Sequence, residues 1–274
     1  NVLVYISVVA VSLKKKRTLM LHAAVAFFSF SLSASSVYIL NDCLDLASDR
    51  RHPRKKTRPF ASGSLSIPFG LTLALGCLVA GVLLAFVLPR EFFMVLTVYL
   101  TLTTAYSFYL KQFVLLDVIV LAQLYTVRVY GGGAATEVVP SHWLLTFSLF
   151  LFLSLALIKR FTELRVTSQT EDRELHGRGY WVTDLEQISS IGTASGLLAV
   201  LVLALYISSK EVLLLYSHAE VLWLVCPVML YWISRIWMLA YRNQMDDDPV
   251  VFAVKDPESY VTAVLLGAIL YLAK

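Results

Sequence analysis

The stretch ILNDCLDLASDRRHPRKKTRPFASG, residues 39–63, decides both the fold class of this chain and the place of its chemistry. Four acids or amides open it (Asn41, Asp42, Asp45 and Asp49), and a run of basic residues follows them. Long apolar segments precede and follow the stretch. This arrangement predicts a charged functional segment at the point where a membrane helix ends.

The rest of the chain is strongly apolar. Its 274 residues are 58% hydrophobic and only 15% charged, with a mean hydropathy of +0.72. A soluble domain of this length needs more polar surface. Apolar runs of about 20 residues, enough to cross about 30 Å of hydrocarbon, recur along it. We therefore predict an all-α polytopic membrane bundle that forms a single domain over residues 1–274.

Apolar windows between polar breaks predict about nine membrane spans. The first apolar run comes before its positive charges, unlike a signal peptide. We therefore expect an N-terminally truncated chain that begins with the remains of a membrane helix. The predicted spans are residues 1–13, 18–40, 68–88, 92–109, 114–131, 142–159, 188–208, 219–241 and 259–273.

Loop charges predict the orientation. Loops on the side of the acidic segment hold fourteen Lys and Arg residues, and the opposite side holds seven. The positive-inside rule thus puts the acidic segment in the cytoplasm, on a protein of the inner (plasma) membrane, although the cluster 14–17 opposes this. No basic helix face indicates nucleic-acid binding. The cysteines Cys43, Cys77 and Cys226 form no disulfide or metal pattern.

The acidic residues share one side of a helix. At 100° per residue, Asn41, Asp42, Asp45 and Asp49 fall within about a quarter-turn. Negative charge at a helix C-terminus opposes the helix dipole, which favours a bound counter-ion over a merely solvated helix end. Magnesium usually takes one or two carboxylates together with substrate phosphates. We predict that these four residues bind Mg²⁺ and that the three aspartates are catalytic.

The basic loop that follows predicts phosphate contacts. Arg58 precedes Pro59, which restricts the backbone to an extended setting, and arginine binds phosphate through two parallel hydrogen bonds. We therefore predict that Lys56 and Arg58 contact phosphate. The alternative is that the run serves only as a positive-inside anchor.

The motif NDCLDLASD resembles the NDxxDxxxD motif of the UbiA superfamily of intramembrane prenyltransferases. The resemblance continues into HPRKKTRPFASG and, with the number of spans, covers essentially the whole chain. It implies a helical bundle around a cytosol-facing cavity. In that cavity the aspartates would hold magnesium-bound pyrophosphate, and a lipid tail would lie along the membrane-facing side.

The chain departs from the superfamily at its second acidic motif, DxxxD. The corresponding segment reads LIKRFTEL, in which Lys159, Arg160 and Glu163 share one helix face. This face predicts direct phosphate binding rather than a second magnesium site, with a helix-end salt bridge as the alternative. Asp172 and Asp184 are candidate substitute acids, and the preceding GRGYWVT segment is a candidate lid.

Three further segments carry candidate residues. In AYSFYLKQFVLLDVIVLA, Lys111 and Tyr106 are candidate pyrophosphate contacts, or an interfacial lysine beside an aromatic belt. Asp117 is a candidate metal or substrate contact, and Arg128 is expected either in the bundle interior or pointing outward to the interface. The acids at 246–248 precede Pro249, which favours a turn over a metal site.

The segments KRFTEL, GRGY and DDDPVVFA resemble the decaprenyl-phosphate phosphoribosyltransferase branch, some relatives of which carry an upstream soluble hydrolase-like domain. This implies Mg²⁺-dependent transfer of 5-phosphoribose from phosphoribosyl pyrophosphate to a polyprenyl phosphate. The alternative is prenyl transfer to an aromatic or quinone-precursor acceptor, which should need the second acidic pair. A cation transporter is disfavoured because the charges cluster at one interface rather than at the midplane. The expected partners are the lipid substrate, the phosphorylated donor, the membrane and, optionally, a second copy of the chain.

Overall fold

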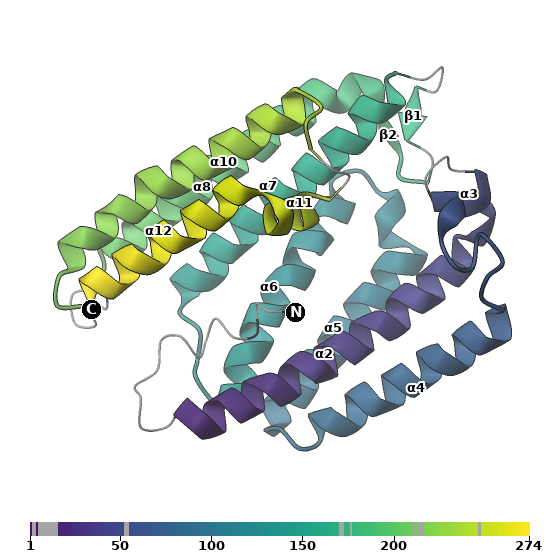
Figure 1. The fold of residues 1–274 in the computed structure, drawn as a ribbon, viewed down its shortest axis with the longest axis horizontal. Coiled ribbons are helices and arrows are strands. Elements are labelled where there is room, and N and C mark those ends of the chain that lie inside the picture. The colour runs from purple at the N-terminus through teal and green to yellow at the C-terminus, as the bar shows by residue number, and fades with distance from the viewer. Residues whose placement is uncertain are drawn as a thin grey trace. The chain divides into compact units, whose positions relative to one another are not determined.

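The computed structural model describes residues 1, 4, 16–51, 55–169, 173–175, 177–210, 212, 216–245 and 248–274. Over these ranges the chain is almost entirely helical (Figure 1). Within these ranges, seven helices are long and apolar enough to cross a membrane. The prediction of an all-α polytopic membrane protein is therefore confirmed.

The helices correspond closely to the predicted spans. The predicted span 1–13 falls almost wholly outside the described residues, and span 259–273 corresponds to α12, which has 17 residues. A short helix, α11, precedes α12 and was not anticipated. The principal helices are α2 (Lys16–Leu44), α4 (Ile67–Ala85), α5 (Arg90–Phe108), α6 (Leu116–Thr136), α7 (His142–Thr167), α8 (Leu185–Ile207), α10 (Val225–Tyr241), α11 (Pro249–Lys255) and α12 (Pro257–Ala273).

The chain divides into two compact units. The first contains residues 1–110 and 127–140, and the second contains residues 111–126 and 141–274. Helix α6 thus begins in the second unit and ends in the first. The single domain expected from the sequence stays a prediction.

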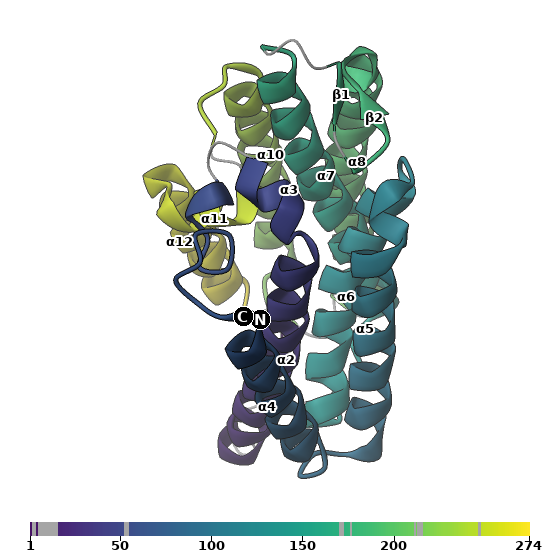
Figure 2. The same ribbon diagram turned by 90° about the vertical axis from the view of Figure 1, so that its right-hand side faces the viewer.

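In the first unit, α2 packs along α4, and α5 packs against both (Figures 1 and 2). Gly81 lets α2 and α4 approach closely, since a Cβ there would lie 2.6 Å from the Ser33 hydroxyl. The Ser29 hydroxyl donates to the Gly81 carbonyl at 2.7 Å. Small residues of this kind are typical of close helix contacts in membranes, where no hydrophobic force drives helices together. This packing holds the middle of α2 against α4, about two turns before the acidic motif begins.

In the second unit, α7 packs along α8, and α10 packs against both helices. The Trp237 indole donates to the Ser154 hydroxyl at 3.1 Å, and that hydroxyl donates to the Gly192 carbonyl at 2.8 Å. Helix α12 lies beside α10 (Figure 1). Between α7 and α8, strands β1 (Glu174–Leu175) and β2 (Tyr180–Trp181) pair antiparallel. Gly179 permits the turn with a φ of +67°.

Candidate active site

The acidic motif continues the helical path of α2 through a break. Helix α2 ends at Leu44, and α3 (Leu46–Arg51) follows it directly. The amide of Asp45 donates to the Asn41 carbonyl at 2.9 Å, and the amide of Asp49 donates to the Asp45 carbonyl at 2.8 Å. This i to i+4 spacing keeps the motif on one helical path. The Asn41 side-chain amide also donates to the Asp45 carboxylate at 2.9 Å.

Arg58 binds two of the motif's aspartates. Its Nη1 lies 2.9 Å from Asp42 Oδ1 and 2.9 Å from Asp49 Oδ2. Arg58 follows the 3₁₀ turn Lys55–Thr57, and buried Phe60 anchors the loop beyond it. The sequence pointed to Arg58 as a phosphate contact, but it did not show that Arg58 lies on the predicted metal ligands. Lys56 is exposed at the same loop.

The acidic motif suits a magnesium ion that also uses substrate oxygens. Among the described residues, no three His, Cys, Asp or Glu side chains are grouped so that they could share an ion. Magnesium does not require such a cage, because it usually takes one or two carboxylates with phosphate oxygens and waters. Asp42 is 30% exposed and Asp49 only 5% exposed. One partly open and one buried carboxylate therefore fit a site that is completed by a bound diphosphate.

A second cluster joins α6, α7 and the β1–β2 hairpin. The Asp117 and Arg160 side chains are fully buried, and Arg160 Nη2 lies 2.8 Å from Asp117 Oδ2. Arg160 also pairs with Glu163 through its other terminal nitrogen. The Tyr180 hydroxyl donates to Asp117 Oδ1 at 2.5 Å and accepts from the Leu115 amide at 2.8 Å. Three predicted residues thus come together with Tyr180, which the sequence did not single out.

The electrostatics of this cluster fix the proton of Tyr180, while two nitrogens of Arg160 lack a hydrogen-bond partner in the part of the chain that the structure describes. Burial, reinforced by the negative charge of Asp117, raises the pKa of the Tyr180 phenol well above its usual value. Tyr180 therefore stays protonated and is the donor to Asp117. Arg178 adds a cation 3.9 Å from Asp117 Oδ2. The Arg160 Nε and Nη2 atoms are buried without a hydrogen-bond partner among the described groups, although Nη2 keeps its ion pair with Asp117. Nε has no such carboxylate beside it within the described ranges, which is costly unless a ligand or water accepts from it.

Lys159 is engaged by a different carboxylate. Its ammonium lies 2.9 Å from Asp248 Oδ2, a residue 89 positions away in the chain. Burial alone would raise the pKa of Asp248, but the charge of Lys159 and its hydrogen bond hold that pKa below its usual value. Asp248 also caps α11 by accepting from the Val250 amide at 2.9 Å. Asp248 is thus the N-cap of α11, which begins at Pro249. Positions 246 and 247 lie outside the described residues, so the turn predicted over 246–248 stays a prediction.

The remaining candidates in the described part of the chain are Asp184, Tyr106, Lys111 and Arg128. Asp184 accepts from the Trp181 amide at 2.9 Å and so stabilises the turn before α8. Tyr106, near the end of α5, and Lys111, on the short 3₁₀ turn Leu110–Gln112, are half-buried. Arg128 is buried and donates to the Tyr99 hydroxyl at 2.8 Å, which agrees with the interior alternative. Position 172 lies outside the described residues.

Comparison with known sequences identifies the family. The sequence profile of the UbiA prenyltransferase family matches residues 2–255. The chain belongs to this family. Because the described part of the chain includes seven helices long and apolar enough to span a bilayer, the protein is an integral membrane protein. The resemblance inferred from NDCLDLASD is thereby confirmed.

Three relatives show how far the likeness extends within the UbiA family. The Sinorhizobium fredii protein y4nM is 34% identical, over 100% of this chain and 53% of its own length. The nodulation protein NoeC of Azorhizobium caulinodans is 36% identical, over 86% of this chain and 77% of its own. A Mycobacterium tuberculosis decaprenyl-phosphate phosphoribosyltransferase is 35% identical, over 54% of this chain and 49% of its own. The chain therefore spans about half the length of y4nM.

Solved structures share the UbiA fold. A UbiA homolog from Archaeoglobus fulgidus, bound to DMAPP and Mg²⁺, gives a TM-score of 0.67 at 14% identity, covering 91% of this chain and 88% of that one. A UbiA homolog from Aeropyrum pernix gives 0.67 at 16% identity, covering 99% and 94%. At such low identity these likenesses establish the fold alone.

Proposed function

We propose that this UbiA-family protein transfers 5-phosphoribose from phosphoribosyl pyrophosphate to a polyprenyl phosphate. The observation that carries the proposal is the buried Arg160, which stands where the superfamily's second acidic motif is expected. With Arg178, Asp117 and Glu163 it forms a set of two cations and two carboxylates. Such a set has no excess of carboxylates for a second divalent ion, and the Arg160 Nε atom in it can still donate to a phosphate oxygen. Likeness to the mycobacterial phosphoribosyltransferase over 147 residues supports the same choice.

The proposed reaction is a displacement at C1 of the ribose. The bond between C1 and the pyrophosphate oxygen breaks, and pyrophosphate leaves with the electron pair. An oxygen of the acceptor phosphate forms the new bond to C1. Because that phosphate is already anionic at neutral pH, no side chain is needed as a base. Binding, orientation and charge compensation are therefore what the chain has to supply.

The acidic motif is proposed to hold Mg²⁺ against the donor. Asp42, Asp45 and Asp49, with the Asn41 side chain, would supply the protein oxygens, and the ion supplies charge neutralisation to the pyrophosphate. Arg58 would add hydrogen bonds to the same leaving group, and Lys111 stays a predicted pyrophosphate contact. We further propose that this motif lies on the cytoplasmic side of the inner membrane, because the loops of that side hold most of the Lys and Arg residues.

Arg160 is proposed to bind a phosphate oxygen of one substrate through Nε. Its terminal nitrogens are held by Asp117 and Glu163, so the guanidinium is fixed in orientation before substrate arrives. Tyr180 fixes Asp117 in turn. The two carboxylates and the phenol thus act as positioning residues for a single donor. Because the Arg160 guanidinium is already oriented, no free energy is needed to order it when the transition state forms.

Arg58→Gln is expected to change metal and phosphate binding in opposite directions. Without substrate, removal of the cation from Asp42 and Asp49 should tighten Mg²⁺ binding about 3- to 10-fold, as expected for a partly exposed ion pair. Pyrophosphate affinity in the presence of Mg²⁺ should fall about 10-fold or more, since charge-assisted hydrogen bonds are lost. Calorimetric titration of each ligand measures both effects. Arg58→Lys is the control that keeps the charge, and weaker Mg²⁺ binding in Arg58→Gln would contradict this view of Arg58.

Tyr180→Phe is expected to lower kcat/KM about 10-fold, because the hydroxyl that orients Asp117 is lost and the Leu115 amide loses its acceptor. The unfolding free energy should fall by about 1–3 kcal/mol, the usual cost of leaving a buried polar group unpaired. Kinetics for both substrates, beside thermal unfolding in detergent, separate the two effects. A variant that is only less stable, with unchanged kcat and KM, would show that Tyr180 does not position the site.

The proposed function is tested by labelling each candidate donor. Purified protein is incubated with Mg²⁺, polyprenyl phosphate and radiolabelled phosphoribosyl pyrophosphate, and the lipid fraction is counted and analysed by mass spectrometry. A parallel reaction contains labelled prenyl diphosphate and an aromatic acceptor. Label in the lipid as a phosphoribosyl adduct supports the proposal. Label on the aromatic acceptor instead would assign the chain to prenyl transfer and overturn it.

A further inference from the structure

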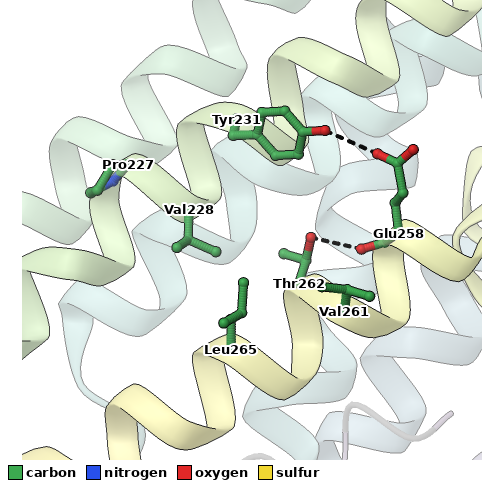
Figure 3. Close-up of a pocket in the computed structure, with 7 residues that line it drawn as sticks. All are labelled: Pro227, Val228, Tyr231, Glu258, Val261, Thr262 and Leu265. Atoms are coloured by element: carbon green, nitrogen blue, oxygen red, sulfur yellow. Dashed lines mark hydrogen bonds between the residues drawn. The ribbon is translucent and has the colours of Figure 1, made fainter.

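A groove runs between α10 and α12 in the second unit (Figure 3). Its volume is about 480 Å³, and none of its lining residues belongs to the two clusters described above. Pro227, Val228 and Tyr231 line it from α10. Glu258, Val261, Thr262 and Leu265 line it from α12.

One part of the groove is apolar and faces outward. Val261 is 59% exposed and Leu265 is 48% exposed, whereas Val228 on α10 is half-buried. In an integral membrane protein, apolar side chains exposed on membrane helices meet hydrocarbon rather than water. A groove lined in this way accommodates a lipid acyl chain. A molecule that binds in the groove therefore needs an apolar chain.

The other part of the groove is a charged cluster at the start of α12. Arg235 holds Asp256 through two hydrogen bonds, at 2.7 and 3.0 Å. Its Nε also lies 2.5 Å from the Glu258 carboxylate, to which the Tyr231 hydroxyl donates at 2.9 Å (Figure 3). Two carboxylates therefore share one guanidinium, which leaves a net negative charge on these three residues.

The excess charge lies where a ligand can reach it. Asp256 is only 7% exposed, and it is satisfied by Arg235 and by the Ser259 amide and hydroxyl. The Glu258 side chain, in contrast, is 53% exposed and points into the groove (Figure 3). Glu258 lies in the first turn of α12, which is the level at which an apolar membrane helix reaches the headgroup region.

We propose that this groove binds a membrane phospholipid whose headgroup carries a primary ammonium group. The acyl chain lies along Val228, Val261 and Leu265, and the ammonium donates to the Glu258 carboxylate. A purely anionic headgroup is repelled by the net negative charge. A quaternary ammonium carries the same charge as a primary one but has no N–H to donate, so it binds less well.

The proposal is tested by native mass spectrometry of the purified protein in detergent. Equal amounts of dioleoyl lipids with ethanolamine, choline or glycerol headgroups are added in turn, and retained lipid is measured. The wild-type chain is expected to retain the ethanolamine lipid about 2- to 5-fold more than either of the others, the range expected for an exposed ion pair. Glu258→Gln should remove this preference.

Two variants separate the groove from general effects of charge and folding. Glu91→Gln removes a carboxylate from the first turn of α5, outside the groove, and should leave the preference intact. Val261→Trp fills the apolar part and should reduce retention of all three lipids. Equal or greater retention of the glycerol lipid by the wild-type chain would overturn the proposal. So would an unchanged preference in Glu258→Gln, or a groove covered by a second copy of the chain with no lipid retained.

Discussion

The double variant Asp45→Asn, Asp49→Asn is expected to release pyrophosphate at least about 100-fold more slowly than the wild-type protein. Removing one preorganised charge-stabilising group commonly costs about 10²–10³ in rate, and this variant removes two carboxylates from the proposed metal site. Asparagine preserves side-chain size, so the helical path from α2 into α3 should persist. Pyrophosphate release at saturating Mg²⁺ and donor measures the effect.

A matched control separates this effect from a general loss of acidic charge. The double variant Glu91→Gln, Glu220→Gln removes two exposed carboxylates outside the motif and should turn over at the wild-type rate. Circular dichroism and the unfolding midpoint establish that both double variants are folded. A folded Asp45→Asn, Asp49→Asn protein that turns over normally would remove the catalytic role from the acidic motif.

The largest loss of stability is expected for Asp117→Leu. This change leaves Arg160 fully buried with only Glu163 as its carboxylate partner, and it removes the acceptor of the Tyr180 hydroxyl. Breaking a buried ion pair from one side typically costs about 3–5 kcal/mol, because an uncompensated charge remains. Denaturant unfolding in detergent should therefore show a loss of about 3 kcal/mol or more.

The double variant Asp117→Leu, Arg160→Met provides the decisive comparison. Replacing both partners of a buried pair by apolar side chains is often neutral for stability. We therefore expect the double variant to recover most of the stability that Asp117→Leu loses, while activity stays low because the proposed phosphate donor is gone. An Asp117→Leu variant as stable as the wild type would show that the Asp117–Arg160 ion pair does not stabilise the contact between α6 and α7.

Local features were predictable from the sequence because they depend on nearby residues. Apolar runs predicted the helices, and 3.6-residue periodicity predicted the common path of Asn41, Asp45 and Asp49, which main-chain hydrogen bonds confirm. The family was predictable because its motif is a compact pattern of nine residues. The first predicted span stays a prediction because its residues are almost all outside the described ranges.

Long-range pairings could not be predicted in the same way. Tyr180 and Asp117 are 63 positions apart, and no periodic pattern shows that a hairpin tyrosine meets the start of α6. The sequence therefore predicted Lys159 and Arg160 as cations for phosphate, without revealing that Asp248 and Asp117 already neutralise them. Arg58 illustrates the same limit, since its loop bends back onto Asp42 and Asp49. GRGY was the one visible signal for Tyr180.

The central claim is that the acidic motif at the end of α2 holds a divalent ion together with pyrophosphate. Electron paramagnetic resonance of Mn²⁺, used as a probe for Mg²⁺, tests this most directly on the purified chain with and without pyrophosphate. We predict that pyrophosphate tightens Mn²⁺ binding to the wild-type protein and that Asp45→Asn, Asp49→Asn abolishes the pyrophosphate-dependent signal. Equal Mn²⁺ binding by both proteins in the presence of pyrophosphate would contradict the claim.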